Sequence, residues 1–465
     1  MHSNRKGLLN YLEVAAFVVL CLIMTYSVFW GVGNPVSIGG LSGWMLLLSL
    51  FLLCACLPMV HDLRRILRNS RLWAVVALGV WVLFAAVSGF MKGHPVSVVI
   101  RDISGLIYFA FLPFLLAVIR NEKRLHTVMK CMMYAAFAMC FLYTGCFILF
   151  LYAPDAFESV KAYFVQINFL NYTRVSGSIP RLLFVSLPFQ LLGCAFSVYF
   201  QIRSEKFKPM YACITGLSLF VIVMTFTRAL YLAALVAAVC LIVSFAFSVN
   251  KANRTKLWIH IAASALVCLM ALGALSLLGG FNYMNYAVRR VVVGLDASII
   301  ETTAPVESTE PQDDVPATEP EKKPHGKDTE AENYLQATVD SDALRGIIKE
   351  ELLTRISQSP VTGNGMGILL EHKKDWPEYS FLDLLAKMGL IGLGLYFLPL
   401  ALMLLEIIRG IAAGKDILLP AAWVAGMIGL MVYSIFQPYL NNVQCILIYC
   451  CTLCSNAGWH TKNDN

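Results

Sequence analysis

The sequence predicts an all-α, polytopic membrane protein with about twelve transmembrane helices and both termini on the cytoplasmic side. The class follows from composition, because 58% of the 465 residues are hydrophobic and only 14% are charged, whereas a soluble domain carries about 25% charged residues. The orientation follows from the loops, because every second loop between apolar runs is rich in Lys and Arg. The net charge of +7 therefore reflects membrane topology, and we expect no nucleic-acid partner.

The apolar runs are long enough for membrane helices of about 20 residues and lack the alternation of barrel strands. The expected spans cover roughly residues 8–30, 36–60, 71–90, 98–119, 128–152, 181–201, 209–226, 229–248, 257–279, 379–406, 417–436 and 440–457. The basic loops precede span 1 and follow spans 2, 4, 6, 8 and 10. The positive-inside rule makes these loops cytoplasmic. The first span lacks a small-residue cleavage site after it, so we expect a retained helix.

This topology divides the chain into three parts. Residues 1–280 hold helices 1–9, residues 281–378 form a large extracytoplasmic loop before helix 10, and residues 379–465 hold helices 10–12 and a cytoplasmic tail. Residues 301–333 are rich in Pro, Glu and Thr without an aromatic residue, which predicts disorder. Residues 341–359 have the pattern of an amphipathic helix. The 14 cysteines lie in or beside apolar runs, so we expect packing residues rather than disulfides or metal ligands.

Arginine residues on the outer side are few, and they are the first candidates for a binding site. In this topology the outer arginines are Arg101, Arg174, Arg181, Arg228, Arg289, Arg290 and Arg345. Arg228 is the most constrained, since the turn 225–229 in TFTRALYLAALVA is short and boundary charges facing a bundle are functional candidates. Arginine suits bidentate phosphate binding, so a shared cavity would bind pyrophosphate. Head-group anchoring or local ion pairing is the simpler alternative.

Three outer motifs resemble those of the bacterial O-antigen ligase and O-antigen polymerase family. They are the turn TFTRALYLAAL, the helix and glycine-rich segment ALRGIIKEELLTRISQSPVTGNGMG (343–367), and the span opening EYSFLDLLAKMGLIGLGLYF (378–397). With the span layout, the resemblance covers most of the chain. It implies a multi-pass enzyme of the bacterial inner or plasma membrane, with its active site facing the extracytoplasmic side. Such an enzyme transfers a glycan from an undecaprenyl-pyrophosphate-linked donor to an acceptor glycan or glycolipid, without a cofactor.

The resemblance also implies roles for residues. The essential arginines of the ligases match Arg228 and Arg345, and their essential histidine falls on Glu378. We expect the arginines to bind the donor pyrophosphate and Glu378 to deprotonate the acceptor, with His372 as a substitute for the missing histidine. Arg174 matches another frequently basic position. The remaining substrate-binding candidates are Arg101, Arg181, Arg289, Arg290, Gly363, Gly365 and Asp383.

Simpler interpretations remain beside these roles. Glu378 would otherwise be a solvated residue capping a span, and Asp383 would form an i,i+4 ion pair with Lys387. Gly363 and Gly365 would either cradle phosphate through backbone N–H groups or form a tight turn back to the membrane.

Three classes of function stay open at this point. We favour a polymerase of O-antigen, capsule or related surface polysaccharide, because Glu replaces His and the outer insert is acidic. A ligase acting on lipid A core is the first alternative. A flippase of lipid-linked sugars is the second, although it would be expected to contain internal repeats, and we find none. A non-catalytic structural membrane protein is the third, although it would not need an arginine in the turn 225–229.

Overall fold

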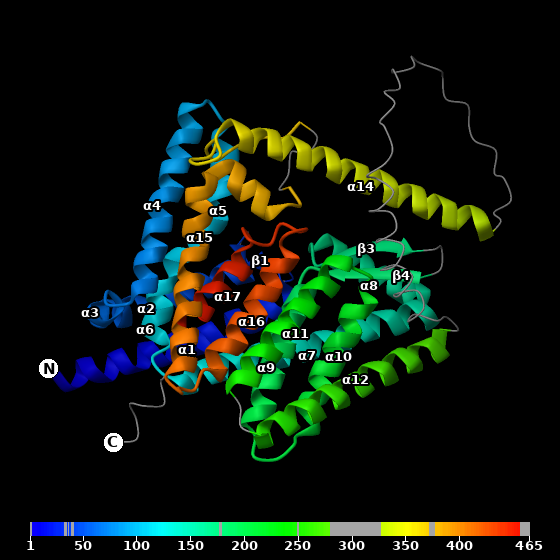
Figure 1. The fold of residues 1–465 in the computed structure, drawn as a ribbon, viewed down its shortest axis with the longest axis horizontal. Coiled ribbons are helices and arrows are strands. Elements are labelled where there is room, and N and C mark those ends of the chain that lie inside the picture. Colours follow the sequence, from blue (N-terminus) through cyan, green and yellow to red (C-terminus); the bar gives the residue numbers. More distant parts are fainter. Residues whose placement is uncertain are drawn as a thin grey trace.

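The structure is a bundle of helices with two short β-hairpins. The computed structural model describes residues 2–31, 35, 37–38, 41–175, 179–248, 251–279, 327–371 and 377–455. Its elements (Figure 1) are α1 His2–Trp30, β1 Ser37–Ile38, β2 Leu41–Ser42, α2 Gly43–His61, α3 Leu63–Ile66, α4 Ser70–Met91, α5 Val96–Leu106, η1 Ile107–Phe111, α6 Leu112–Val118, α7 Glu122–Tyr152, α8 Pro154–Gln166, β3 Leu170–Val175, β4 Ile179–Phe184, η2 Leu187–Phe189, α9 Gln190–Arg203, α10 Pro209–Met224, α11 Arg228–Ser248, α12 Lys251–Gly279, α14 Lys327–Gln358, α15 Ser380–Ala412, α16 Leu418–Tyr433 and α17 Val443–Cys454. The predicted all-α membrane class is confirmed.

Eight helical segments among the described residues are long and apolar enough to cross a membrane. They correspond to eight of the twelve expected spans. Three shorter apolar helices, α10, α16 and α17, lie in the seventh, eleventh and twelfth spans, and the 14-residue α9 lies in the sixth. Every expected span therefore contains a helix, but four of these helices are shorter than a full crossing.

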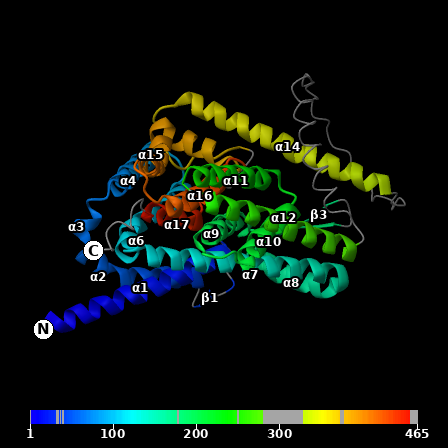
Figure 2. The ribbon, with the colours of Figure 1, turned by 60° about the horizontal axis from the view of Figure 1, so that its bottom comes forward.

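The short helices α9, α16 and α17 form the centre of the bundle, with longer helices around them (Figures 1 and 2). Nearly all residues of these three helices are buried. Their burial shows that these helices pack against other parts of the protein rather than facing lipid. Irregular backbone at membrane depth is tolerated where protein surrounds it, so a central helix need not cross the whole hydrocarbon layer.

The sixth expected span is wrong in its first part. Residues 181–184 belong to β4, which pairs antiparallel with β3 and matches Leu170 to Phe184. The chain then passes through η2 and starts α9 only at Gln190. Pro180 and Pro188 lie in this stretch and cannot occupy a helix interior. Arg181 is therefore carried by a strand.

The outer helix is longer than predicted. α14 starts at Lys327, so residues 327–333, expected to be disordered, are helical, while 301–326 lie outside the described residues. α14 lies across one end of the bundle, and the start of α1 lies at the opposite end (Figures 1 and 2).

At the end opposite α14, basic residues form ion pairs with carboxylates from other segments of the chain. Arg120 and Arg124 both form ion pairs with Glu13, and Arg203 pairs with Asp416. These loops are the ones that the charge pattern predicts to be cytoplasmic.

Candidate active site

The turn between α10 and α11 holds Arg228 in a fixed position. Phe226 in this turn has a positive φ of 50° and is fully buried. This is a strained conformation for a residue other than glycine. The Thr225 hydroxyl donates to the Ile222 carbonyl at 2.7 Å and accepts from the Thr227 amide at 3.2 Å. The expected tight turn is therefore confirmed, and it presents Arg228 at the first position of α11.

Arg181 lies against the same turn. From strand β4, its Nε donates to the Thr225 carbonyl at 3.2 Å and its Nη2 donates to the Thr227 hydroxyl at 3.3 Å. The hairpin thus brings a second guanidinium next to the residues that immediately precede Arg228. We call Arg181, Arg228 and the turn residues 225–227, which Arg181 contacts, the arginine turn.

The position of Arg228 is not explained by helix stability. The N-terminus of a helix carries partial positive charge, so a cation in its first turn is unfavourable. The same end attracts anions through its free N–H groups. The helix N-terminus and two neighbouring guanidinium groups therefore favour an anionic ligand at the arginine turn.

α14 is fixed over the start of α15 by a small apolar cluster. Ile348 and Leu352 on α14 are almost fully buried against a group that includes Leu370 and Ala386. Arg345 lies one turn before Ile348, and helical residues three apart share a face. Docking of the apolar face therefore directs Arg345 toward the chain that leads into α15.

Arg345 and Glu378 are in direct contact. The Arg345 Nε donates to the Glu378 Oε2 at 2.5 Å, and the two side chains are 37% and 25% exposed. Two residues that lie far apart in the sequence and were predicted to share a site are thus brought together. We call them the open pair, because both side chains remain partly exposed.

Asp383 belongs to a second, enclosed ion cluster. The Lys387 ammonium lies 2.8 Å from a carboxylate oxygen of Asp383 and 3.0 Å from one of Asp102. The second Asp102 oxygen accepts from the Gly367 amide at 2.8 Å. The three charged side chains are between 1% and 7% exposed. The predicted ion pair of Asp383 with Lys387 is confirmed. We call Lys387, Asp383 and Asp102 the sealed cluster, and the burial of Asp383 in it favours a structural role over substrate binding.

α15 is broken close to the sealed cluster. Gly389 has a φ of 66° and a ψ of −174° inside the helix. The Leu390 and Ile391 amides donate to the carbonyls of Pro360 and Val361, at 2.9 and 3.2 Å. A Cβ on Gly389 would lie 2.2 Å from the Val361 oxygen. The loop after α14 therefore fills the break.

The glycine-rich segment uses its own amides in the same junction. They donate to protein oxygens: Gly363 to Ser359 (3.0 Å), Asn364 to Ala386 (2.8 Å), Gly365 to Lys387 (3.0 Å), Met366 to Ala85 (2.9 Å) and Gly367 to Asp102 (2.8 Å). An N–H group carries one hydrogen, so these amides are already engaged. Gly363 and Gly365 thus form the tight turn of the alternative interpretation, and the phosphate cradle is not supported.

The loop between α16 and α17 links the open pair to the arginine turn. The Ser380 hydroxyl, two residues after Glu378, donates to the Gln437 carbonyl at 2.7 Å. The Tyr439 hydroxyl donates to the Val185 carbonyl, just after β4, at 2.7 Å. Burial raises the pKa of Tyr439 well above its usual range, so it remains a neutral donor.

The other predicted residues are placed as follows. Arg174 lies on β3, where its backbone pairs with Pro180. Arg101 lies on α5, and its charge acts on Asp383 in the sealed cluster. Arg289, Arg290 and His372 lie outside the described residues.

Sequence reasoning missed Asp102 and the threonines of the arginine turn. Asp102 had a usable signal, because an acidic residue inside an apolar run needs a partner. Thr225 and Thr227 act mainly through local hydrogen bonds, which the pattern alone does not reveal. Within the described ranges, no three His, Cys, Asp or Glu side chains gather as metal ligands would.

Comparison with known protein families gives a match over part of the chain. Residues 213–397 match a family model described as O-antigen ligase. This stretch, which is less than half of the 465-residue chain, is therefore similar to an O-antigen ligase domain. The match runs from α10 to α15 and therefore includes Arg228, Arg345 and Glu378. No curated protein matches the chain.

The predicted resemblance is confirmed over this domain. The domain supports an O-antigen ligase or polymerase type of function in surface polysaccharide assembly. The family acts on lipid-linked glycans and acceptors, and it implies a glycosyltransferase-like activity.

Proposed function

We propose that the protein transfers or polymerises a glycan from an undecaprenyl-pyrophosphate-linked donor onto an acceptor at the outer face of the membrane. The observation that carries the proposal is the contact between Arg345 and Glu378. It unites a cation and a general base at the end of the bundle that also carries the arginine turn. Both functions are needed to break a glycosyl–pyrophosphate bond.

The arginines bind the donor. Arg228, with Arg181 behind the same turn and Arg345 on α14, provides charge for the pyrophosphate. Negative charge on the pyrophosphate grows as its bond to the sugar breaks, and fixed cations stabilise that charge most strongly in the transition state. No resident metal is required in this scheme, since guanidinium groups take its electrostatic role.

Glu378 is the base. Its carboxylate accepts the proton of the acceptor hydroxyl, whose oxygen forms a bond to the anomeric carbon on the face opposite the pyrophosphate. The pyrophosphate leaves with the electron pair of the broken C–O bond, so the anomeric configuration inverts. Arg345 orients the carboxylate through its hydrogen bond. General-base catalysis contributes roughly 10²–10⁴-fold in rate.

Among the subtypes, we favour a polymerase over a ligase. A polymerase uses a second lipid-linked repeat as acceptor, and the replacement of His by Glu at position 378 departs from the ligase pattern. The flippase alternative receives little support. Broken helices do occur in transporters, but the break at Gly389 is closed by hydrogen bonds to the 360–365 loop.

The proposal is tested with purified protein and a lipid-linked oligosaccharide. Release of undecaprenyl pyrophosphate together with a longer glycan supports a polymerase. Release only when lipid A core is added supports a ligase. Movement of the intact donor across a vesicle membrane without bond cleavage would reject the enzyme.

A further inference from the structure

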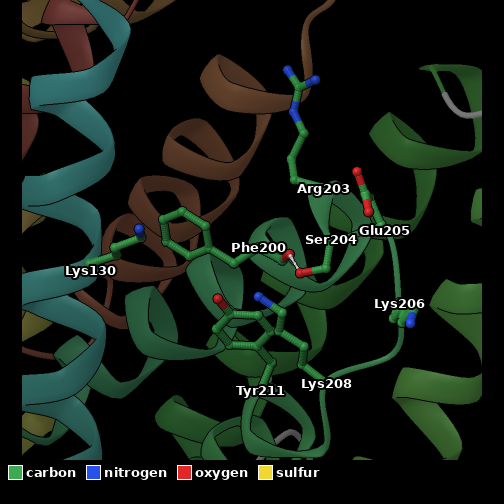
Figure 3. A pocket seen from close by; sticks show the side chains of 8 residues that line it. All are labelled: Lys130, Phe200, Arg203, Ser204, Glu205, Lys206, Lys208 and Tyr211. Carbon is green, nitrogen blue, oxygen red and sulfur yellow. Dashed lines mark hydrogen bonds between the residues drawn. The ribbon is translucent and has the colours of Figure 1, made fainter.

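A basic hollow lies at the end of the bundle opposite α14, away from the proposed active site. It has a volume of about 450 Å³ and lies between α7, the end of α9 and the start of α10. Figure 3 shows Lys130 entering from α7, with Arg203, Lys206 and Lys208 on the α9–α10 side. Glu205 is the one carboxylate in its lining.

The cations of this hollow are not equally engaged. Arg203 forms an ion pair with Asp416, so much of its charge is compensated. Lys130, Lys206 and Lys208 form no ion pair within the described residues. Three ammonium groups around one hollow create a positive potential that attracts an anion.

Two aromatic rings form the floor of the hollow. Phe200 and Tyr211 are each 7% exposed. The Lys130 ammonium lies 5.6 Å from the centre of the Phe200 ring, and the Lys208 ammonium lies 6.0 Å from that of Tyr211. These contacts hold the two ammonium groups at the edge of the apolar bundle.

Lys130 also lies deeper than an ordinary loop lysine. It is eight residues into α7, and eight residues of helix correspond to about 12 Å. On the same face of α7, Tyr134, Phe141 and Ile148 follow at spacings of four and seven residues, and all three are exposed. An apolar stripe thus runs from the hollow along the outside of the bundle.

We propose that this hollow binds the phosphate of an anionic glycerophospholipid, with an acyl chain lying along the α7 stripe. The lysines supply the charge complementarity, and the stripe supplies the surface that a soluble phosphate would not use. Basic pockets between membrane helices are suited to anionic head groups. The bound lipid belongs to the leaflet opposite α14, which the loop charges predict to be cytoplasmic.

The test compares phosphatidylglycerol with phosphatidylcholine in titrations followed by native mass spectrometry of the full-length protein. The wild type binds phosphatidylglycerol more tightly than phosphatidylcholine. Replacing Lys130→Gln together with Lys208→Gln weakens phosphatidylglycerol binding by about 10- to 30-fold, since each basic residue near an anionic surface contributes about fivefold. Binding of phosphatidylcholine stays unchanged.

Two control variants accompany this pair. Lys123→Gln with Lys415→Gln removes two exposed lysines outside the hollow and leaves the preference intact. Lys130→Arg with Lys208→Arg keeps the charge and retains the preference, which separates loss of charge from misfolding. If the glutamine pair misfolds, the single Lys130→Gln variant is used, with about a fivefold loss.

Equal affinity for phosphatidylglycerol in the wild type and the glutamine pair overturns the proposal. So does an equal loss in the Lys123 and Lys415 control. Full displacement of the lipid by soluble glycerol phosphate at matched concentration also overturns it, because the ligand would then be a free phosphate.

Discussion

The sealed cluster and the open pair both include residues of the short stretch from Glu378 to Lys387 at the start of α15, but they differ in burial. Lys387, Asp383 and Asp102 are at most 7% exposed, the Lys387 ammonium contacts both carboxylates, and Asp102 also accepts from the Gly367 amide. Arg345 and Glu378 are 37% and 25% exposed. Removing one partner from a buried group leaves an uncompensated charge, whereas an exposed pair adds little stability. Similar charges are therefore enclosed in one place and partly exposed in the other, where the proposed function places the substrate.

Among the variants that test this comparison, Lys387→Met is expected to lower stability the most. The change leaves two aspartates facing each other in the interior, which costs about 3–5 kcal/mol of stability. We expect a clear fall in the apparent Tm of the detergent-solubilised protein. Lys92→Met, at an exposed position after α4, is the matched control and leaves Tm unchanged. Equal Tm values for the two variants would show that the sealed cluster does not hold the structure.

Arg228→Ala is expected to affect activity instead. Loss of one charge-stabilising donor lowers the rate of glycan transfer by about 10²–10³-fold. Because Arg228 is exposed, its removal changes the apparent Tm little. The rate is measured as undecaprenyl pyrophosphate released from a lipid-linked oligosaccharide. Arg68→Ala, an exposed arginine at the opposite end, should keep the full rate, and full activity in Arg228→Ala would remove the arginine turn from the mechanism.

Gly389→Ala tests the loop junction beside the sealed cluster. A left-handed conformation at alanine costs about 1–3 kcal/mol, and the new Cβ would also meet the Val361 oxygen at 2.2 Å. We expect a lower Tm and a lower transfer rate together, because the 360–365 loop would lose its packing against the break in α15. Gly394→Ala lies on the same helix with nothing within 4 Å. It should leave Tm unchanged or raise it, and similar behaviour of both variants would contradict the packed junction.

Arg345→Gln is expected to change the stability of the protein the least. An exposed ion pair contributes about 0–1 kcal/mol, so the Tm of this variant should lie close to that of the wild type. A fall as large as that of Lys387→Met would mean that the open pair is also a structural cluster. The comparison between the two clusters would then fail.

Much of the fold could be predicted because hydrophobic length and loop charge are local properties of the sequence. They predicted a helix in each of the twelve spans and the tight turn before Arg228. They did not predict β4, where Pro180 and Pro188 outweigh an apolar run, or the short central helices, whose length depends on their protein surroundings. Lipid and a protein core both favour apolar residues. Hydrophobicity therefore does not distinguish a helix that crosses the membrane from a strand or a short helix buried in the protein.

The candidate site was only partly predictable, because the motifs indicate a side of the membrane but not which residues meet. Arg345 and Glu378 were expected to act together and are in contact. Asp383 and Gly363 carried the same kind of signal, yet they belong to the sealed cluster and the loop junction. The difference depends on Asp102, which is 281 residues from Asp383 in the chain by their numbering, so no local pattern reveals it.

The most direct test of the account is the transfer rate of Glu378→Gln, measured on protein whose Tm equals that of the wild type. Glutamine keeps the size of the side chain but does not act as a base at neutral pH. The account predicts a loss of about 10²–10⁴-fold in the rate of glycan transfer. A rate within twofold of the wild type, from equally stable protein, would contradict the assignment of the open pair to catalysis.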